Sequence, residues 1–281
     1  MTKILLFGTS GNPPTGRDGH TGMIEYFVSL ARFDEVWVLP VYEHMFSLKR
    51  HAMAEVGAPT FEDRIEMCRL SFERYSTVGC AVKVLRTEQE VFTKALTARE
   101  GGDTAAPTRT CMYDVVRYLQ DRHPDAQFSL LLGTDTYQDL RNGRWRNSDG
   151  LKRMVSLVVV DRLGVRGETE NLLAGVETHH PPLLTDVSST KIRKASAREL
   201  LGGTLAIEYQ VVQYMREKRL FGFGRQSRLD RALMEAADRF SKPWRIAAGV
   251  AVLVVAIGVG SAAAARRRGG GRISAAGFAG R

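Results

Sequence analysis

Short blocks of uninterrupted apolar residues, separated by longer stretches of mixed polarity, recur through the first 224 residues of the chain. Runs such as ILLF, SLLLG and SLVVV lack the alternation of a strand with one wet face. They are typical of strands that are covered on both faces in a parallel sheet. The segments with this strand character are Lys3–Gly8, Glu35–Pro40, Ala81–Leu85, Phe128–Gly133 and Ser156–Asp161.

Stretches with helical character lie between and after these strands. Strands that alternate with helices predict an α/β protein with a Rossmann-like, doubly wound parallel sheet. In such folds, ligands bind at the carboxyl ends of the strands. The predicted helices are His20–Arg32, Glu62–Arg74, Met112–Asp121, Thr190–Leu201 and Ile207–Arg219.

The positive charge of the chain is concentrated at its C-terminal end. The 281 residues carry a formal net charge of +9. Residues 225–281 contain 11 Lys and Arg against 3 Asp and Glu, a net +8, which leaves +1 for residues 1–224. A basic protein favours nucleic acid or an anionic membrane as a partner. Because the body is nearly neutral, we expect no nucleic-acid binding.

The cysteines and histidines show no metal-binding or disulfide pattern. Cys68, Cys80 and Cys111 are odd in number and contain no CxxC pair, which argues against a disulfide framework or a zinc ribbon and favours a reducing compartment. The segment His179–Pro182 (HHPP) has no further Cys or His at ligand spacing. We therefore interpret it as a loop and predict no metal-binding residues.

An uncharged run of 20 residues, IAAGVAVLVVAIGVGSAAAA, lies between Arg245 and the triplet Arg266–Arg268. About 20 apolar residues in a helix span the hydrocarbon core of a bilayer. We therefore predict a single C-terminal transmembrane helix, with the body facing the cytosol; the identity of the membrane stays open. A buried or oligomerising Ala- and Gly-rich helix is the alternative, and homo-oligomers stay open. The predicted parts are a globular domain (1–224), a basic juxtamembrane linker (225–245), the anchor (246–265) and a basic Gly-rich tail (266–281).

The first motif follows the first strand and has the sequence FGTSGNPPTGRDGHTG, Phe7–Gly22. A loop rich in Gly, Ser, Thr and Pro leads here into a helix that begins at His20. Gly8 and Gly11 allow a close approach of the backbone to a ligand, and a helix N-terminus favours phosphate. The motif matches neither GxGxxG nor GxxxxGK[ST]. An ordinary strand–turn–helix connection is the alternative.

The second motif, Val187–Arg193 (VSSTKIR), places three hydroxyls at the start of a helix. Arg193 follows Ser189 by one helical turn and so lies on the same face. Hydroxyls, unpaired N–H groups and a cation that converge on one point suit a polyphosphate. A helix cap with a solvated arginine is the alternative.

Together, the two motifs resemble the nucleotidyltransferase superfamily marked by (H/T)xGH and ISSTxIR. Within it, their order is similar to that of the nicotinamide/nicotinate mononucleotide adenylyltransferases. The resemblance covers about Lys3 to Gly222. Further segments that carry it are Phe61–Met67, Gly133–Asp135 (GTD), Trp145 and Val159–Gly164.

One departure from the family pattern lies in the first motif. The compact family form has a single residue between its Thr or His and the Gly-His pair, whereas two additional residues stand between Thr15 and Gly19–His20 here. This spacing leaves open whether Thr15 reaches phosphate. Arg17, inside the insertion, either contributes a charge to the site or is solvated.

The resemblance implies attack of the mononucleotide 5′-phosphate on the α-phosphorus of ATP, giving NAD or deamido-NAD and pyrophosphate. The nucleophile is already an anion, so catalysis consists of positioning and charge stabilisation. Mg²⁺ would be carried by the ATP phosphates. The residues that the resemblance assigns are His20 and Arg193 for catalysis, Gly8, Thr9, Ser10, Thr15, Ser188, Ser189, Thr190 and Arg193 for ATP and its phosphates, and Lys49, Asp135 and Trp145 for the mononucleotide.

Two other functions stay open. One is nucleotidyl transfer to another phosphorylated acceptor, such as phosphopantetheine or a phospho-alcohol, which has no ring to stack on Trp145. The other is a catalytically inactive membrane tether that binds nucleotide. The preference between the amide and the acid form of the mononucleotide also stays open, and a position in the core is the alternative for Trp145.

Overall fold

The computed structural model of the protein describes residues 1–43, 58–103, 109–161, 173–182, 184–195, 199–200 and 206–225. Lys49, the turn at 162–164 and residues 226–281, which include the predicted anchor, lie outside these ranges. No helix within the described ranges is both long and apolar enough to cross a bilayer. The membrane anchor at 246–265 stays a prediction.

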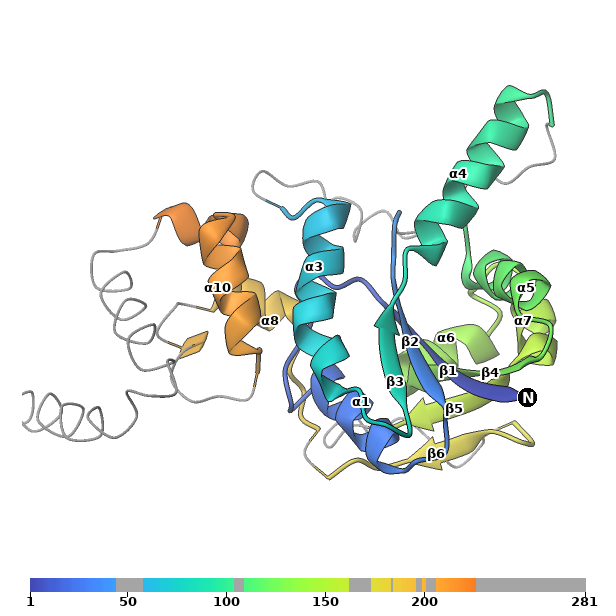
Figure 1. Ribbon diagram of the computed structural model, residues 1–281, viewed down its shortest axis with the longest axis horizontal. Helices are drawn as coiled ribbons and strands as arrows, with labels where there is room; N and C mark the ends of the chain where they lie inside the picture. The colour runs from blue at the N-terminus through green and yellow to red at the C-terminus, as the bar shows by residue number, and fades with distance from the viewer. Residues whose placement is uncertain are drawn as a thin grey trace, which may run out of the picture. The chain divides into compact units, whose positions relative to one another are not determined.

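The described residues form a six-stranded parallel sheet with the strand order β3-β2-β1-β4-β5-β6 (Figure 1). The order reverses between β1 and β4, so that the crevice at the carboxyl ends of these two strands is the topological switch point. The α/β, Rossmann-like class is confirmed. The strands are β1 (Thr2–Thr9), β2 (Glu35–Pro40), β3 (Ala81–Val84), β4 (Ala126–Gly133), β5 (Ser156–Val160) and β6 (Glu177–His179).

Helices connect the strands and cover both faces of the sheet (Figure 1). Helices α1 and α3 pack on one face, and α5, α6 and α7 pack on the other. The helices are α1 (His20–Ser29), α3 (Phe61–Phe72), α4 (Thr87–Glu100), α5 (Met112–Arg122), α6 (Thr134–Arg141), α7 (Ser148–Met154), α8 (Ser189–Lys194) and α10 (Tyr209–Glu217), with 3₁₀ turns at Glu73–Tyr75 and Leu220–Arg225.

The core consists of two apolar clusters, one on each side of the sheet. Successive side chains of a strand point to opposite faces, so that Leu5 joins the α1–α3 cluster and Leu6 joins the α5–α7 cluster, and both are fully buried. Burial of each such side chain stabilises the fold by roughly 1.5–3 kcal/mol. This two-sided burial is the reason that the strands are continuous apolar blocks.

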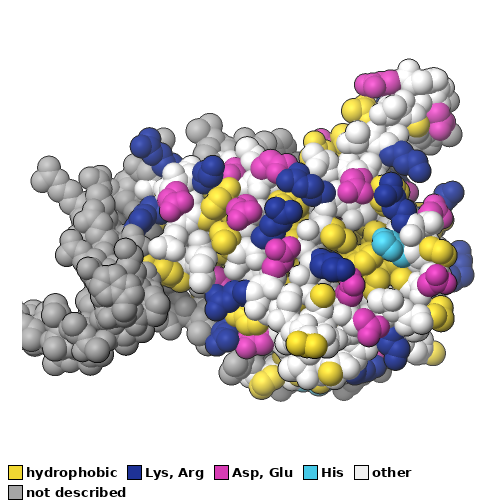
Figure 2. Space-filling view, in the orientation of Figure 1, with side chains coloured by type: hydrophobic (Ala, Val, Ile, Leu, Met, Phe, Trp, Pro, Cys, Tyr) yellow, Lys and Arg dark blue, Asp and Glu magenta, His cyan; other side chains and the backbone are white. Residues whose placement is uncertain are grey.

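The surface carries charges of both signs. Figure 2 shows Lys and Arg side chains interspersed with Asp and Glu on the face in view. Several of them form ion pairs, such as Lys83 with Glu35 at 2.7 Å. Exposed pairs of this kind contribute about 0–1 kcal/mol each.

The structure adds elements that the sequence patterns did not predict. Helices α4, α6 and α7 and strand β6 were missed. The interpretation of residues 179–182 as a loop is wrong for His179, which ends β6. This strand has only three residues, Glu-Thr-His, and no apolar run, and its polar side chains suit the edge of the sheet.

Several predicted helices are shorter than expected; α10, for example, covers only Tyr209–Glu217 of the predicted 207–219. Helix α1 ends at Ser29, and Ala31 just beyond it has a positive φ of 50°. Helix α8 (Ser189–Lys194) begins one residue before the predicted 190–201 and ends at Lys194, and residues 199–200 are again helical. Ala195 after it has an extended backbone, which ends the helix.

Candidate active site

The two sequence motifs meet at the carboxyl end of β1. The Ser189 hydroxyl on α8 donates a hydrogen bond of 2.7 Å to the Pro13 carbonyl in the loop after β1. The Arg193 guanidinium donates through Nη1 to the Asn12 carbonyl at 2.6 Å and through Nη2 to the Thr190 hydroxyl at 3.0 Å. These contacts join segments about 180 residues apart in the chain and place the predicted hydroxyls and cation beside the loop that leads to His20.

The His20 ring is oriented by the loop before it. The Thr15 backbone N–H donates to His20 Nδ1 at 3.2 Å, and the ring lies 5.5 Å from the Phe7 ring between centroids. Because Nδ1 accepts a hydrogen bond, the proton of the neutral imidazole resides on Nε2. The geometry therefore prepares Nε2–H as the donating side of the ring.

Thr15 holds the start of α1 in the structure. Its hydroxyl accepts the His20 backbone N–H at 2.7 Å, and its side chain is only 2% exposed. Gly19, at the N-cap position of α1, has no side chain that could do this. Thr15 therefore caps α1 from five residues upstream, and a contact of its hydroxyl with phosphate stays a prediction.

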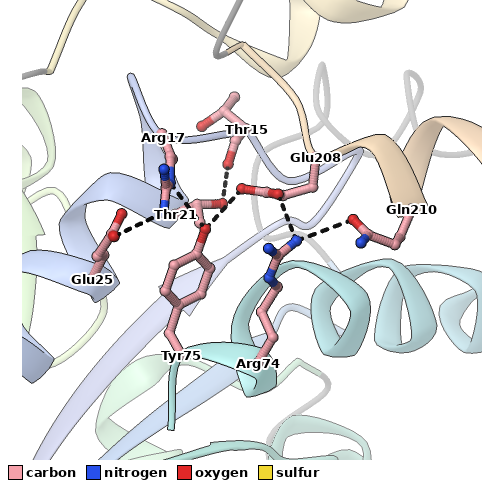
Figure 3. Close-up of polar contacts among 8 residues, drawn as sticks. All are labelled: Thr15, Arg17, Thr21, Glu25, Arg74, Tyr75, Glu208 and Gln210. Carbon is pink, nitrogen blue, oxygen red and sulfur yellow. Dashed lines mark hydrogen bonds and ion pairs between the residues drawn. The ribbon is translucent and has the colours of Figure 1, made fainter. Parts of the chain in front are cut away.

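Within the insertion, Arg17 is exposed and holds the loop from outside (Figure 3), whereas Asp18 is half-buried. Arg17 forms an ion pair with Glu25 at 3.0 Å and donates to the Tyr75 hydroxyl at 3.3 Å. Tyr75 in turn donates to Glu208, which precedes α10. Since the Arg17 and Glu25 side chains are nearly half exposed, the ion pair itself contributes little, and its effect is to fasten the insertion to α1.

Close packing of this loop requires glycine at two positions. A Cβ on Gly19 would lie 2.2 Å from the Thr15 hydroxyl, and a Cβ on Gly22 would lie 1.9 Å from the Arg17 carbonyl oxygen. Both distances are far inside van der Waals contact. The Gly-His-Thr-Gly sequence at the start of α1 therefore follows from the space that the insertion occupies.

The remaining hydroxyls and glycines predicted for ATP line the same edge. A Cβ on Gly8 would lie 2.9 Å from Met112 Cε, which comes from the start of α5. The Thr9 hydroxyl accepts the Gly11 N–H at 3.2 Å. The Ser188 hydroxyl caps α8 by accepting the Lys191 N–H at 3.2 Å.

Arg64 and Glu88 are buried charged residues beneath this edge that the sequence patterns did not single out. The Arg64 guanidinium donates to the carbonyl oxygens of Ser10 and Tyr42 at 3.1 Å each, and also to that of Val41. Glu88 accepts the Tyr42 N–H at 2.9 Å. Arg64 therefore holds the ends of β1 and β2 together, and Glu88 fastens the end of β2 to α4. The available signal was Arg64 itself, a cation on the buried face of α3 between Phe61 and Cys68.

Burial perturbs the titration of these two residues. It lowers the pKa of Arg64 to about 10 and raises that of Glu88 to about 7. The N–H of Tyr42 and the charge of Arg64 oppose the shift of Glu88 without cancelling it. Neutral pH therefore lies close to the midpoint of the Glu88 titration.

Glu88 makes the stability of the fold depend on pH. Its pKa is about 7 in the folded chain against an ordinary value of 4.5, so the folded state binds the proton more tightly. Glu88 therefore contributes up to about 3 kcal/mol to the free energy of unfolding. This contribution is complete below about pH 4.5 and is lost as pH rises through about 7. Glu88→Gln, which keeps an acceptor for Tyr42, should flatten the curve of unfolding free energy between pH 5 and 8, measured by urea denaturation. Parallel curves for the two proteins would contradict this.

The residues predicted for the mononucleotide follow β4, next to β1 in the sheet. Asp135 is exposed in the first turn of α6, directly beyond the carboxyl end of β4. The side chain of Trp145 is partly buried and packs against the α5–α7 cluster, while its carbonyl accepts the Ser148 hydroxyl at 2.6 Å. Asp135 thus lies at the switch point, and Trp145 combines a core contact with an exposed part.

The charged and polar groups at this edge suit an anion better than a metal ion. Within the described residues, no group of three or more His, Cys, Asp or Glu is arranged for metal binding. Hydroxyls and the Arg193 guanidinium accumulate at the carboxyl ends of the strands instead. A Mg²⁺ ion that is already bound to a polyphosphate is compatible with this donor set.

A doubly wound parallel sheet with these two loops at its switch point defines a nucleotide-binding α/β protein with a nucleotidyltransferase-type site. Residues 12–195 match the family model described as cytidylyltransferase-like, and the chain belongs to this family.

Curated relatives confirm the resemblance found in the sequence. The chain is 30% identical over 225 residues to a protein named probable nicotinate-nucleotide adenylyltransferase from Anaeromyxobacter dehalogenans, with 78% of this chain and 96% of that protein covered. It is 25% identical over 225 residues to the nicotinate-nucleotide adenylyltransferase of Bacillus subtilis, with 79% and 99% covered.

Solved structures share the fold at lower identity. The nicotinic acid mononucleotide adenylyltransferase of Plasmodium falciparum complexed with NaAD superposes with a TM-score of 0.59 at 16% identity, covering 80% of this chain and 100% of that one. The same protein complexed with APC gives a TM-score of 0.57. At this identity the likeness concerns the fold alone.

Proposed function

We propose that the protein is an adenylyltransferase that joins ATP and a pyridine mononucleotide, giving deamido-NAD or NAD and pyrophosphate. The observation that carries the proposal is the junction of Ser189 and Arg193 with Asn12 and Pro13, beside the oriented ring of His20. The names of the relatives support the acid form, nicotinate mononucleotide, as the preferred acceptor.

The residues at the junction would act on the phosphates of ATP. His20 Nε2–H donates to a phosphate oxygen, and the Arg193 guanidinium balances the negative charge that moves onto the leaving pyrophosphate. An oxygen of the mononucleotide phosphate forms a bond to the α-phosphorus of ATP as the bond to the β-phosphate breaks. The attacking group is already ionised, so these residues contribute position and charge and no proton is removed. Mg²⁺ on the ATP phosphates would supply further neutralisation.

Asp135 and Trp145 would hold the acceptor at the end of β4. An exposed carboxylate in the first turn of α6 is placed to accept a hydrogen bond from a nucleotide hydroxyl. The exposed part of Trp145 offers a flat aromatic face to the pyridine ring. Phosphopantetheine and phospho-alcohols, the other acceptors to be considered, have no ring for this face.

The proposal predicts which acceptor turns over. The full-length chain with Mg²⁺ and ATP should convert nicotinate mononucleotide to deamido-NAD, and nicotinamide mononucleotide to NAD more slowly, with products separated by chromatography. The same protein given 4′-phosphopantetheine should release no pyrophosphate, and CTP should not replace ATP. Pyrophosphate release with phosphopantetheine and with neither mononucleotide would refute the proposal in favour of the other acceptor class.

A further inference from the structure

Two arginines flank Trp145, and their ion pairs differ in reach. Arg144 pairs with Asp139 at 2.8 Å, a partner five residues away at the end of α6. Arg146 pairs instead with Asp114 in the first turn of α5, 32 residues away, and its Nε donates to Cys111 Sγ at 3.3 Å. Arg146 therefore fastens the Trp145 turn to a separate helix, whereas Arg144 makes a local contact.

The group that receives Arg146 is itself fixed. Asp114 accepts both the backbone N–H of Cys111 at 3.0 Å and its thiol at 3.1 Å, which forms the cap of α5. Burial raises the pKa of the Cys111 thiol, so that the thiol keeps the proton it donates to Asp114. Arg146 thus binds to a helix start that is already ordered by the hydrogen bonds of the Cys111 N–H and thiol to the Asp114 carboxylate.

The backbone of the turn that follows Trp145 is closely restricted. The Ser148 hydroxyl donates to the Trp145 carbonyl at 2.6 Å, and Asn147 has a left-handed backbone with φ of 56°. A Cβ on Gly150 would lie 2.7 Å from the Tyr113 ring, so α7 packs closely on α5. Arg146 is the long side chain that joins this compact turn to α5 on the Trp145 side.

We propose that Arg146 is a positioning residue for the acceptor, which holds the Trp145 ring in place for stacking through its contacts with Asp114 and Cys111. This inference rests on the proposed function, because it assigns the ring of a pyridine mononucleotide to Trp145. A stacked ring tolerates little displacement. Loss of the Arg146 contacts therefore weakens acceptor binding and leaves the ATP side of the site unchanged.

The kinetic test uses the full-length chain and three variants. Arg146→Ala and Trp145→Ala should each raise KM for nicotinate mononucleotide about 10-fold, with kcat and the KM for ATP within about twofold. Arg144→Ala removes the same charge two residues away and should change none of these. An equal loss with both substrates, or an unchanged KM in Arg146→Ala when Trp145→Ala raises it, would overturn the positioning role.

Asp114→Asn separates positioning from a direct contact between Arg146 and the substrate phosphate. The asparagine keeps an acceptor for the Cys111 N–H but loses the ion pair, so KM for the mononucleotide should rise as in Arg146→Ala. If Arg146 bound the phosphate itself, release from Asp114 would leave KM unchanged or lower it. That result would overturn the inference.

A second readout does not depend on turnover. In a full-length chain with Trp37→Phe and Trp244→Phe, fluorescence reports on Trp145 alone. Acrylamide should quench it about twofold more in Arg146→Ala than in Arg144→Ala, because an untethered ring is more accessible. Equal quenching would overturn the positioning of Trp145 even in an active enzyme. Absence of dinucleotide formation by the wild-type protein would instead refute the proposed function.

Discussion

Replacing His20 by Asn should lower kcat by about 10²–10³-fold while leaving the melting temperature nearly unchanged. The Thr15 N–H donates to His20 Nδ1, and an asparagine Oδ1 offers a comparable acceptor at a similar distance from the backbone. The substitution therefore keeps the contact that orders the loop and removes Nε2–H, the group proposed to donate to phosphate. Steady-state kinetics and thermal unfolding measure the two effects separately.

A second substitution at His20 and a control substitution at a distant histidine complete this experiment. His20→Ala removes both ring functions, so it should lose the same turnover and also about 1 kcal/mol of stability, because the Thr15 N–H loses its acceptor. His123→Ala is the matched control, since His123 stands before β4 at the opposite edge of the sheet and packs on Trp37. Wild-type turnover in His20→Asn would remove His20 from the mechanism.

Replacing Arg193 by Ala should lower kcat/KM for ATP by about 10²–10³-fold. The change removes a positive charge from the proposed phosphate site and the hydrogen bond to the Asn12 carbonyl that fastens α8 to the first motif. Arg193→Lys should recover only part of the loss, because a single ammonium cannot reproduce the two directed contacts of the guanidinium. Initial rates at varied ATP concentration measure both effects.

The control for Arg193 lies on the same helix. Lys191 pairs with Asp186, and its side chain is 58% exposed, so Lys191→Ala removes one positive charge from α8 without breaking the junction. It should keep kcat/KM for ATP within about twofold. Equal losses in Lys191→Ala and Arg193→Ala would mean that the overall charge of α8, and not the position of Arg193, attracts the nucleotide.

The parts of the fold that the sequence predicts are those with a strong local pattern. Strands β1, β2, β4 and β5 lie within two residues of their predicted bounds, because burial on both faces leaves a continuous apolar run. Helix α4 was missed since its exposed, charged surface leaves only Thr87, Glu88 and Val91 buried, which is too few for a visible period. Helix α6 follows β4 without a loop, so the sequence has no turn residues that would indicate where the helix begins.

For the candidate site, the sequence supplies residue types, and the contacts between them come from the structure. Glycines, hydroxyls and cations in two motifs indicate phosphate chemistry, and resemblance to the family supplies their roles. The capping of α1 by Thr15 depends on how the two additional residues fold over Gly19 and Gly22, which spacing alone does not determine. Arg64 acts on backbone carbonyls of three other residues, and no sequence pattern names such partners. Lys49 and the predicted anchor stay predictions.

The junction of α8 with the loop after β1 also places the completion of the candidate phosphate site late in the synthesis of the chain. A ribosome makes Asn12 and Pro13 about 180 residues before Ser189 and Arg193, their partners. The nascent chain can therefore pair all six strands of the described sheet and bury most of its core before the two halves of the phosphate site meet. We therefore expect a chain that ends before residue 193 to lack this junction, and with it the proposed nucleotidyl transfer.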